Sequence, residues 1–178
     1  KARPGELNYS SGQNGSTSHL TGELFKSMAN VDIVRVSYKG GPQESADLQS
    51  GRVQMTFSDG TSAAAQIKSG RLRALASTGS ARSVLLSPDL PTVAETLPGF
   101  VAEAVYAFWA PAKTPDAILK RLNQETARAL EKPEVRQRLL NNGLEPVGGA
   151  PEQLLDLVKS QIERLSPVIK AIGTKPGA

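Results

Sequence analysis

Several residue types are absent or rare in this chain, and each absence excludes a class of site. The 178 residues contain no cysteine, which excludes disulfides and thiolate metal centres. The one histidine, His19, excludes a multi-histidine zinc or iron site. Aromatic residues make up only 4% of the chain, and no apolar run approaches the roughly 18 residues that a membrane-spanning helix needs. Residues 1–10 are polar and have no signal-peptide pattern.

The net charge of +4 raises the question of an acidic partner such as nucleic acid. Residues 1–90 hold 10 basic and 7 acidic side chains, and residues 91–178 hold 11 and 10. The basic excess is therefore spread along the chain rather than gathered into a cluster. We expect no nucleic-acid partner, and a mixed surface whose excess charge weakly favours anionic ligands.

The first ninety residues alternate β-branched segments with helical patterns. Leu20, Leu24 and Met28 recur at every fourth position, which is typical of one face of a helix. Strands are predicted over residues 7–10, 32–38, 53–57 and 72–78, and helices from residue 16, from residue 42 and over residues 61–69. This alternation favours parallel pairing through right-handed crossover helices. We therefore predict an α/β fold whose first part is a lobe with a parallel-dominated sheet.

The second half of the chain is almost entirely helical. Residues 100–110 form an extended apolar stretch, and residues 144–147 are a candidate strand. Helices are predicted to begin near residues 115, 133 and 151, and Pro167 should bend the last of them. Their broad apolar faces have scarcely any strand to pack against. A partner element is therefore missing, either a preceding segment or another subunit.

Glycines and small hydroxyl side chains follow each predicted strand. In an open parallel sheet, ligands bind beyond the carboxyl ends of the strands, where loops and helix N-termini converge. The loops concerned are residues 10–17, 39–41, 58–62 and 77–80. Such loops let backbone N–H groups approach a carboxylate or phosphate oxygen. The glycine spacing differs from that of a nucleotide-binding loop, and no lysine precedes Ser16, so we expect no nucleoside triphosphate.

Some side chains in these loops each have two possible roles. Ser16 and His19 lie on one helical face, where they form either a nucleophile and base or a helix cap and loop brace. Asp59 either binds an amine or hydroxyl group of a ligand or caps the helix that follows it. Tyr38 and Lys39, at another strand end, either line a cleft or lie on the surface.

Residues 7–25, which read LNYSSGQNGSTSHLTGELF, together with the VSYKG run at residues 36–40, resemble a known family. They are similar to the second-lobe motif of the Bug family, the periplasmic substrate-binding receptors of tripartite tricarboxylate transporters. Further motifs match in order and spacing over nearly the whole chain, at residues 47–51, 72–76, 91–99 and 110–115.

The resemblance implies a periplasmic-binding-protein-like α/β fold. Residues 1–101 would form the second lobe of the receptor, residues 102–112 a crossover segment, and residues 113–178 C-terminal helices that belong to the other lobe and pack on it. The family's N-terminal lobe, with its carboxylate-binding loop, is absent from this sequence. We therefore expect a fragment or a truncated natural product, whose exposed C-terminal helices could form a homodimer.

The resemblance also implies a function, that of a receptor that closes on a small organic carboxylate. It would deliver this ligand to membrane transporter subunits from the periplasm, without enzymatic activity, metal or cofactor. The expected ligand-binding residues are Ser11, Gly12, Gly15, Ser16, His19, Asp59, Tyr38 and Lys39. Two alternatives remain open: a hydrolase or transferase that uses Ser16 and His19, and a receptor-derived module that binds a protein partner.

Overall fold

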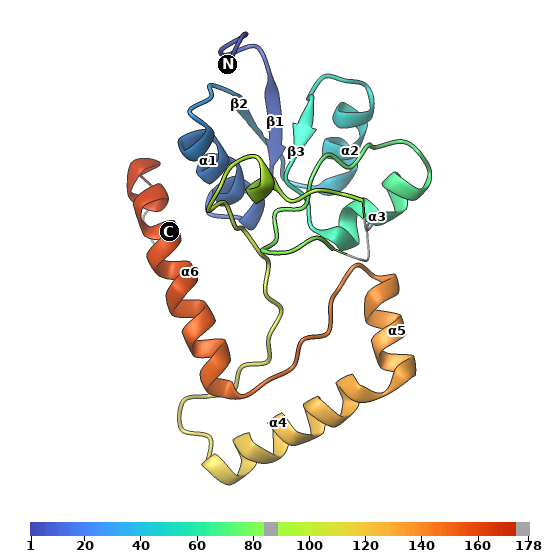
Figure 1. Cartoon of the computed structure of the whole chain (residues 1–178), viewed down its shortest axis with the longest axis vertical. Helices are drawn as coiled ribbons and strands as arrows, with labels where there is room; N and C mark the ends of the chain where they lie inside the picture. The colour runs from blue at the N-terminus through green and yellow to red at the C-terminus, as the bar shows by residue number, and fades with distance from the viewer. Residues whose placement is uncertain (84–88, 174–178) are drawn as a thin grey trace.

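The computed structural model describes residues 1–83 and 89–173 (Figure 1). A three-stranded sheet consists of β1 (Asn8–Ser11), β2 (Val34–Ser37) and β3 (Met55–Thr56), in the order β2-β1-β3. Both pairings are parallel, which confirms the predicted parallel-dominated sheet. We call the part of the chain built around this sheet, up to residue 101, the sheet lobe.

Crossover helices connect the strands, as the sequence predicts. They are α1 (Thr17–Ala29) between β1 and β2, and α2 (Gly41–Gln49) between β2 and β3. A third helix, α3 (Gly60–Lys68), follows β3. Because the second crossover passes back over β1, the two crossovers run in opposite directions along the sheet. Right-handed crossovers of opposite direction place their helices on opposite faces.

Side-chain contacts confirm that α1 and α2 cover opposite faces of the sheet. Tyr9 of β1 donates a hydrogen bond to Glu23 of α1 at 2.6 Å. The next residue, Ser10, donates to Glu44 of α2 at 2.8 Å. Successive side chains of a strand point to opposite faces, so these two bonds fix one helix on each side.

The core of the sheet lobe lies against α1. Leu24 of α1 packs with Phe100 and Val168, and all three side chains are buried. The Phe25 ring meets the Phe100 ring edge-on, with centroids 6.1 Å apart. On the sheet side, α1 approaches so closely that a Cβ atom on Gly22 would lie 2.3 Å from a ring carbon of Tyr9. Glycine is therefore required at position 22 by packing.

The predicted fourth strand over residues 72–78 does not form. Within the described residues, its only ladder contact is an isolated parallel bridge between Ser77 and Thr92. Leu75 in this segment is 66% exposed, so this apolar side chain does not pack against a second layer of the structure. A 3₁₀ turn, η1 (Val93–Glu95), follows Thr92. Residues 144–147, the other candidate strand, are irregular.

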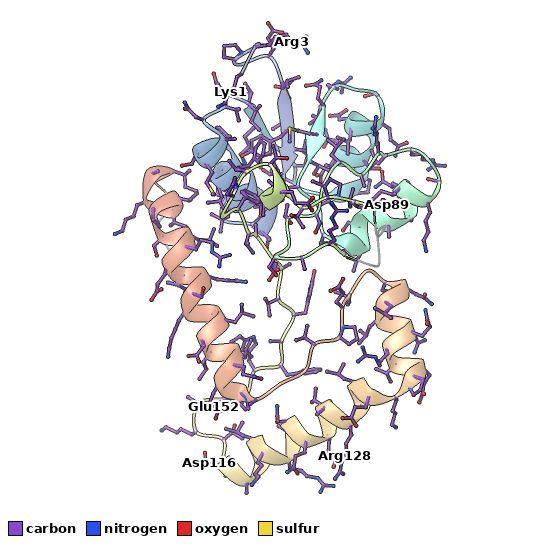
Figure 2. All side chains as sticks on the ribbon, in the orientation of Figure 1. Lys1, Arg3, Asp89, Asp116, Arg128 and Glu152 are labelled. Atoms are coloured by element: carbon purple, nitrogen blue, oxygen red, sulfur yellow. The ribbon has the colours of Figure 1, made fainter. Side chains whose placement is uncertain are left out.

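Three helices form the second half, as predicted: α4 (Asp116–Glu131), α5 (Pro133–Asn141) and α6 (Pro151–Ala171). The last helix continues through Pro167 without interruption. Asp116, the first residue of α4, and Glu152, in the first turn of α6, both lie at the end of the molecule away from the sheet (Figure 2). The last five residues of the predicted C-terminal segment, and residues 84–88 of the sheet lobe, lie outside the described residues.

In the described residues, α6 and the segment that follows α5 both contact the sheet lobe. The C-terminal end of α6 packs against α1 through Val168. After α5, Gly143 packs directly on Gly60 at the start of α3, where a Cβ atom on Gly143 would lie 2.6 Å from the Gly60 carbonyl carbon. Beside this contact, Ser83 donates a hydrogen bond to Glu145 at 2.9 Å.

Between these contacts the second half exposes many large apolar side chains. Phe108 is 87% exposed and Trp109 67% exposed. We call the following exposed apolar side chains the open apolar face: Val105, Tyr106, Phe108, Trp109, Ile118, Leu119, Leu122, Val147, Leu155, Leu157 and Ile162. Large apolar surfaces of a protein are usually covered by another element.

Candidate ligand-binding site

Three loops meet at the carboxyl edge of the sheet, because all three strands are parallel. They are residues 12–16 after β1, residues 38–40 after β2 and residues 57–59 after β3. The N-terminus lies at the opposite end of the sheet lobe, so the carboxyl ends of the strands face the C-terminal helices (Figure 1).

The chain diverges to opposite faces after β1 and β3. After β1 the chain enters α1, and after β3 it enters α3. Ser45 of α2 donates a hydrogen bond to Gln66 of α3 at 3.0 Å. The helix α3 therefore lies beside α2, on the face of the sheet opposite to α1. Neighbouring parallel strands whose following helices lie on opposite faces leave a crevice between their carboxyl ends, where open α/β sheets bind ligands. The candidate site is therefore the crevice between the β1–α1 and β3–α3 loops.

The β1–α1 loop is held by side chains of the first turn of α1. The Gly12 N–H group donates to Ser18 Oγ at 3.0 Å, and the Gly15 N–H group donates to His19 Nδ1 at 3.1 Å. Gly15 has a φ of +79°, which glycine adopts without strain. Ser16 caps the helix, since its Oγ atom accepts from the His19 N–H group at 3.3 Å.

The start of α1 keeps unpaired donors. Within the described residues, the N–H groups of Thr17 and Ser18 have no hydrogen-bond acceptor. A helix N-terminus adds about half a positive charge at this point. The predicted site residues of this loop are thus brought together around a helix end that suits an anion.

Arg35 of β2 is a residue of the site that the sequence patterns did not single out. Its guanidinium donates to Ser11 Oγ at 2.6 Å, to Asn14 Oδ1 at 2.6 Å and to the Gly12 carbonyl oxygen at 2.8 Å. The available signal was a charged residue inside a strand of β-branched residues, which is typical of a side chain with a specific partner.

His19 is held as a neutral imidazole. Its side chain is buried, and burial together with the charge of Arg35 lowers the pKa of His19. Because Nδ1 accepts a hydrogen bond from Gly15, the proton of the neutral ring lies on Nε2. The hydrogen bond between Ser16 and His19 involves the backbone N–H group of His19 rather than its ring. The geometry therefore lacks the hydrogen bond between nucleophile and base that the hydrolase alternative requires.

Asp59 caps α3, which is one of its two predicted roles. Its carboxylate accepts hydrogen bonds from the Ser62 N–H group at 2.8 Å and from the Thr61 hydroxyl group. Burial alone would raise the pKa of Asp59, but these hydrogen bonds outweigh it and the pKa is lowered. Its role as a ligand contact stays a prediction, and the side chain is exposed at the crevice edge.

Tyr38 and Lys39 differ in how they lie at the end of β2. The Tyr38 side chain is buried, and its hydroxyl group donates to Asp47 of α2 at 2.9 Å. Lys39 is exposed. The structure thus brings Lys39 to the carboxyl edge, whereas it turns the Tyr38 hydroxyl group toward α2.

Glu44 is a second residue that the sequence patterns missed. Its Oε1 atom accepts hydrogen bonds from Ser10 of β1 at 2.8 Å and from Thr56 of β3 at 3.1 Å. One carboxylate therefore ties together the two strands that flank the crevice, close to their carboxyl ends.

Other features of the described residues lie outside this site. A hollow of about 320 Å³ lies between the C-terminal half of α1 and the end of α6, away from the carboxyl edge. Residues 1–83 and 89–173 contain no group of three or more acidic, histidine or cysteine side chains that could hold a metal ion. No helix in these ranges is long and apolar enough to cross a membrane.

The fold and its carboxyl-edge loops define a class, the periplasmic binding proteins, whose solved structures superpose closely on this chain. The R. palustris protein Rpa4515, solved with adipate, has a TM-score of 0.83 and 37% identity, over 97% of this chain and 57% of that protein. MatC from Rhodopseudomonas palustris, solved with bound malate, has a TM-score of 0.74 and 30% identity, over 93% and 57%. The predicted α/β fold of this class is confirmed.

The chain belongs to the tripartite tricarboxylate transporter family of receptors, whose model matches residues 1–174. A protein from the tcbD-tcbE intergenic region of Pseudomonas sp. strain P51 is 38% identical over 95% of this chain and 51% of its own length. Protein BugT of Bordetella pertussis is 35% identical over 98% of this chain and 54% of its own length. These relatives confirm the Bug-family resemblance, and the chain spans about half of their length.

Proposed function

We propose that this chain is part of a periplasmic receptor that binds a small organic carboxylate and delivers it to a tripartite tricarboxylate transporter. The observation that carries the proposal lies at the end of the β1–α1 loop. There the N–H groups of Thr17 and Ser18, at the start of α1, lack an acceptor among the described residues. Two solved proteins of the same fold, Rpa4515 and MatC, hold adipate and malate, both carboxylates.

The chemistry of the loop fits a carboxylate group. The helix end offers N–H donors and a partial positive charge. Arg35 and Lys39 add two cationic side chains at the same sheet edge, which attract an anion during its approach. Ser11, Gly12, Gly15, Ser16 and His19 build the loop, and Asp59 and Lys39 lie on the loops that follow β3 and β2. We propose that Asp59 contacts the part of the ligand distal to the bound carboxylate.

The domain organisation is part of the proposal. Residues 1–101 act as the second lobe, residues 102–112 cross between the lobes, and residues 113–178 pack on a first lobe. The open apolar face supports this division, because its exposure begins just after the sheet lobe ends. Ligand binding then favours a closed state of the two lobes. When the first lobe is absent, the same face would pair with a second copy of the chain.

A thermal-shift panel tests the function. The panel contains mono-, di- and tricarboxylates, with uncharged amides of the same length as controls, and it is applied to this chain and to a version extended by the expected first lobe. Ligand at a hundredfold above its Kd should stabilise the extended protein by about 2.7 kcal/mol. The amides should produce no shift.

Two outcomes would contradict the proposal. Equal shifts with carboxylates and amides would show that charge does not matter to the site. The absence of any shift in a folded, extended protein would leave a module that binds a protein partner as the better reading.

A further inference from the structure

We propose that Arg35 is the residue that positions the β1–α1 loop for carboxylate binding, an inference that rests on the proposed function. Arg35 lies on β2, directly opposite Tyr9 of the neighbouring β1. From this edge strand its side chain reaches the end of β1 and bonds to three acceptors there: Ser11 Oγ, the Gly12 carbonyl oxygen and Asn14 Oδ1. A fourth, longer bond of 3.4 Å goes to Ser37 Oγ on β2 itself.

The three bonds use the shape of the guanidinium group. Its Nε, Nη2 and Nη1 atoms each donate to a different acceptor, at 2.6 Å, 2.8 Å and 2.6 Å. A planar fork of donors is pre-organised for such contacts, whereas a lysine ammonium is a single point charge. Arg35 therefore spans the turn from Ser11 to Asn14 with one side chain.

This clamp decides which polar groups of the loop remain for a ligand. The Gly12 carbonyl oxygen also accepts from Ser37 Oγ at 3.1 Å, so both of its side-chain donors outside the loop come from β2. A carbonyl or amide oxygen that faced the ligand would repel a carboxylate. By holding these acceptors, Arg35 leaves the donors of the helix end facing the crevice, and it orders the loop before the ligand arrives.

Two amides of the loop also bond to α1. Gly12 and Gly15 donate their N–H groups to Ser18 and His19 of α1. Loss of the Arg35 side chain should therefore loosen the loop, so that these two amide bonds open more often, while the sheet lobe stays folded. The expected defect is local disorder of the loop and weaker binding, not unfolding.

The test compares Arg35→Ala and Arg35→Lys with Arg3→Ala as a charge-matched control. Arg3 lies at the other end of the sheet lobe (Figure 2) and pairs with Glu6 at 3.5 Å. Two quantities are measured for each variant. The first is the hydrogen-exchange rate of the Gly12 and Gly15 amides in this chain without ligand. The second is the Kd of the version extended by the expected first lobe for adipate and for malate, by calorimetry.

We expect Arg35→Ala to accelerate exchange of the two loop amides by about tenfold or more, and to raise the Kd by at least about tenfold. Arg35→Lys keeps the charge but loses two of the three bonds, so both quantities should remain closer to the alanine variant than to the unaltered protein. Arg3→Ala should change neither quantity.

Three results would overturn the inference. One is an exchange rate in Arg35→Ala equal to that of the unaltered chain. Another is a Kd that Arg35→Lys restores fully, which would mean that charge alone matters. A third is faster exchange in Arg35→Ala with an unchanged Kd. If the unaltered extended protein binds no carboxylate, the proposed function fails, while the exchange rates still decide whether Arg35 positions the loop.

Discussion

Phe100 and Phe108 lie close together in the chain, yet one is 0% exposed and the other 87% exposed. Phe100 belongs to the sheet lobe and packs with Leu24 and Val168. Phe108 belongs to the open apolar face and has no comparable packing. The boundary between the two environments falls in the predicted crossover segment. The comparison indicates that the sheet lobe has a buried core, which Val168 of α6 completes, whereas the second half exposes a surface suited to contact with another protein element.

The interactions of polar side chains also differ between the sheet lobe and the second half, which is mostly helical. In the described residues of the sheet lobe, buried Ser10, Ser11 and His19 all have hydrogen-bond partners, and no buried side-chain nitrogen or oxygen of the described chain lacks one. In the helical half, the ion pairs are solvent-exposed contacts within single helices, such as the pair of Arg121 with Glu125 at 2.9 Å. Exposed pairs of this kind contribute little to stability.

The largest expected effect comes from the two phenylalanines themselves. Phe100→Ala should lower the free energy of unfolding by about 3–5 kcal/mol, because it empties a packed core position. Phe108→Ala removes the same atoms from an exposed position and should change it by less than about 0.5 kcal/mol. Urea denaturation of both variants, followed by circular dichroism, measures the difference. Similar losses in the two variants would contradict the comparison.

A smaller loss is expected from close packing between α1 and the sheet. Gly22→Ala places a Cβ atom against the Tyr9 ring, so the free energy of unfolding should fall by about 1–3 kcal/mol. Gly41→Ala is the control, since a Cβ atom at Gly41 meets no other atom within 4 Å. Thermal unfolding of both variants tests the contact. A Gly22 variant as stable as the Gly41 variant would show that α1 does not lie so close to β1.

The protonation of His19 should make the stability of the chain depend on pH. Burial lowers its folded pKa below its ordinary value, so the unfolded chain binds a proton at a higher pH than the folded chain does. The stability of the sheet lobe should therefore fall as the pH drops below about 6.5, by at most about 1.4 kcal/mol per pH unit. Unfolding midpoints between pH 7.5 and pH 5 measure this slope.

His19→Asn is the matched variant for the pH experiment. It does not titrate in this range, and the acidic groups Glu23 and Asp59 have lowered pKa values, so they titrate below it. The slope between pH 7.5 and pH 5 should disappear in this variant. A slope that persists would assign the pH dependence to another group.

The smallest effect separates the two roles of Asp59. Asp59→Ala removes the cap of α3 and should cost about 1 kcal/mol of stability. Asp59→Asn keeps a capping oxygen but removes the charge, so its stability should stay near that of the unaltered chain. If the Asp59 carboxylate contacts the ligand, both variants should bind the ligand more weakly than the unaltered protein does. Loss of stability without loss of affinity would leave capping as the whole role of Asp59.

The regular elements could be predicted from the sequence where side-chain periodicity and end signals agree. The four-residue recurrence of Leu20, Leu24 and Met28 and the Ser16 cap predict α1 correctly. The segment at residues 72–78 shows where this reasoning stops. Its composition is typical of a strand, but a strand also needs a neighbouring strand along its length. Among the described residues, this segment makes a single isolated bridge, between Ser77 and Thr92.

The candidate site was only partly predictable, for a related reason. The glycines and hydroxyl groups of the β1–α1 loop are visible in the sequence because they are local. The contacts of Arg35 and Glu44 depend on which strands are neighbours and in what register, as does the direction of the Tyr38 hydroxyl group. Sequence patterns report the helix or strand on which a side chain lies, but not the side chain of another element that it meets.

The packing of α6 against α1 joins the two ends of the chain. Leu24, near the N-terminus, shares a buried cluster with Val168, near the C-terminus. Contacts between such distant positions close a long loop and form late in folding. During synthesis, the sheet lobe would leave the ribosome with one side of α1 uncovered. Its core would be completed only when α6 emerges, so all of the chain between α1 and α6 must be made before α1 is fully buried.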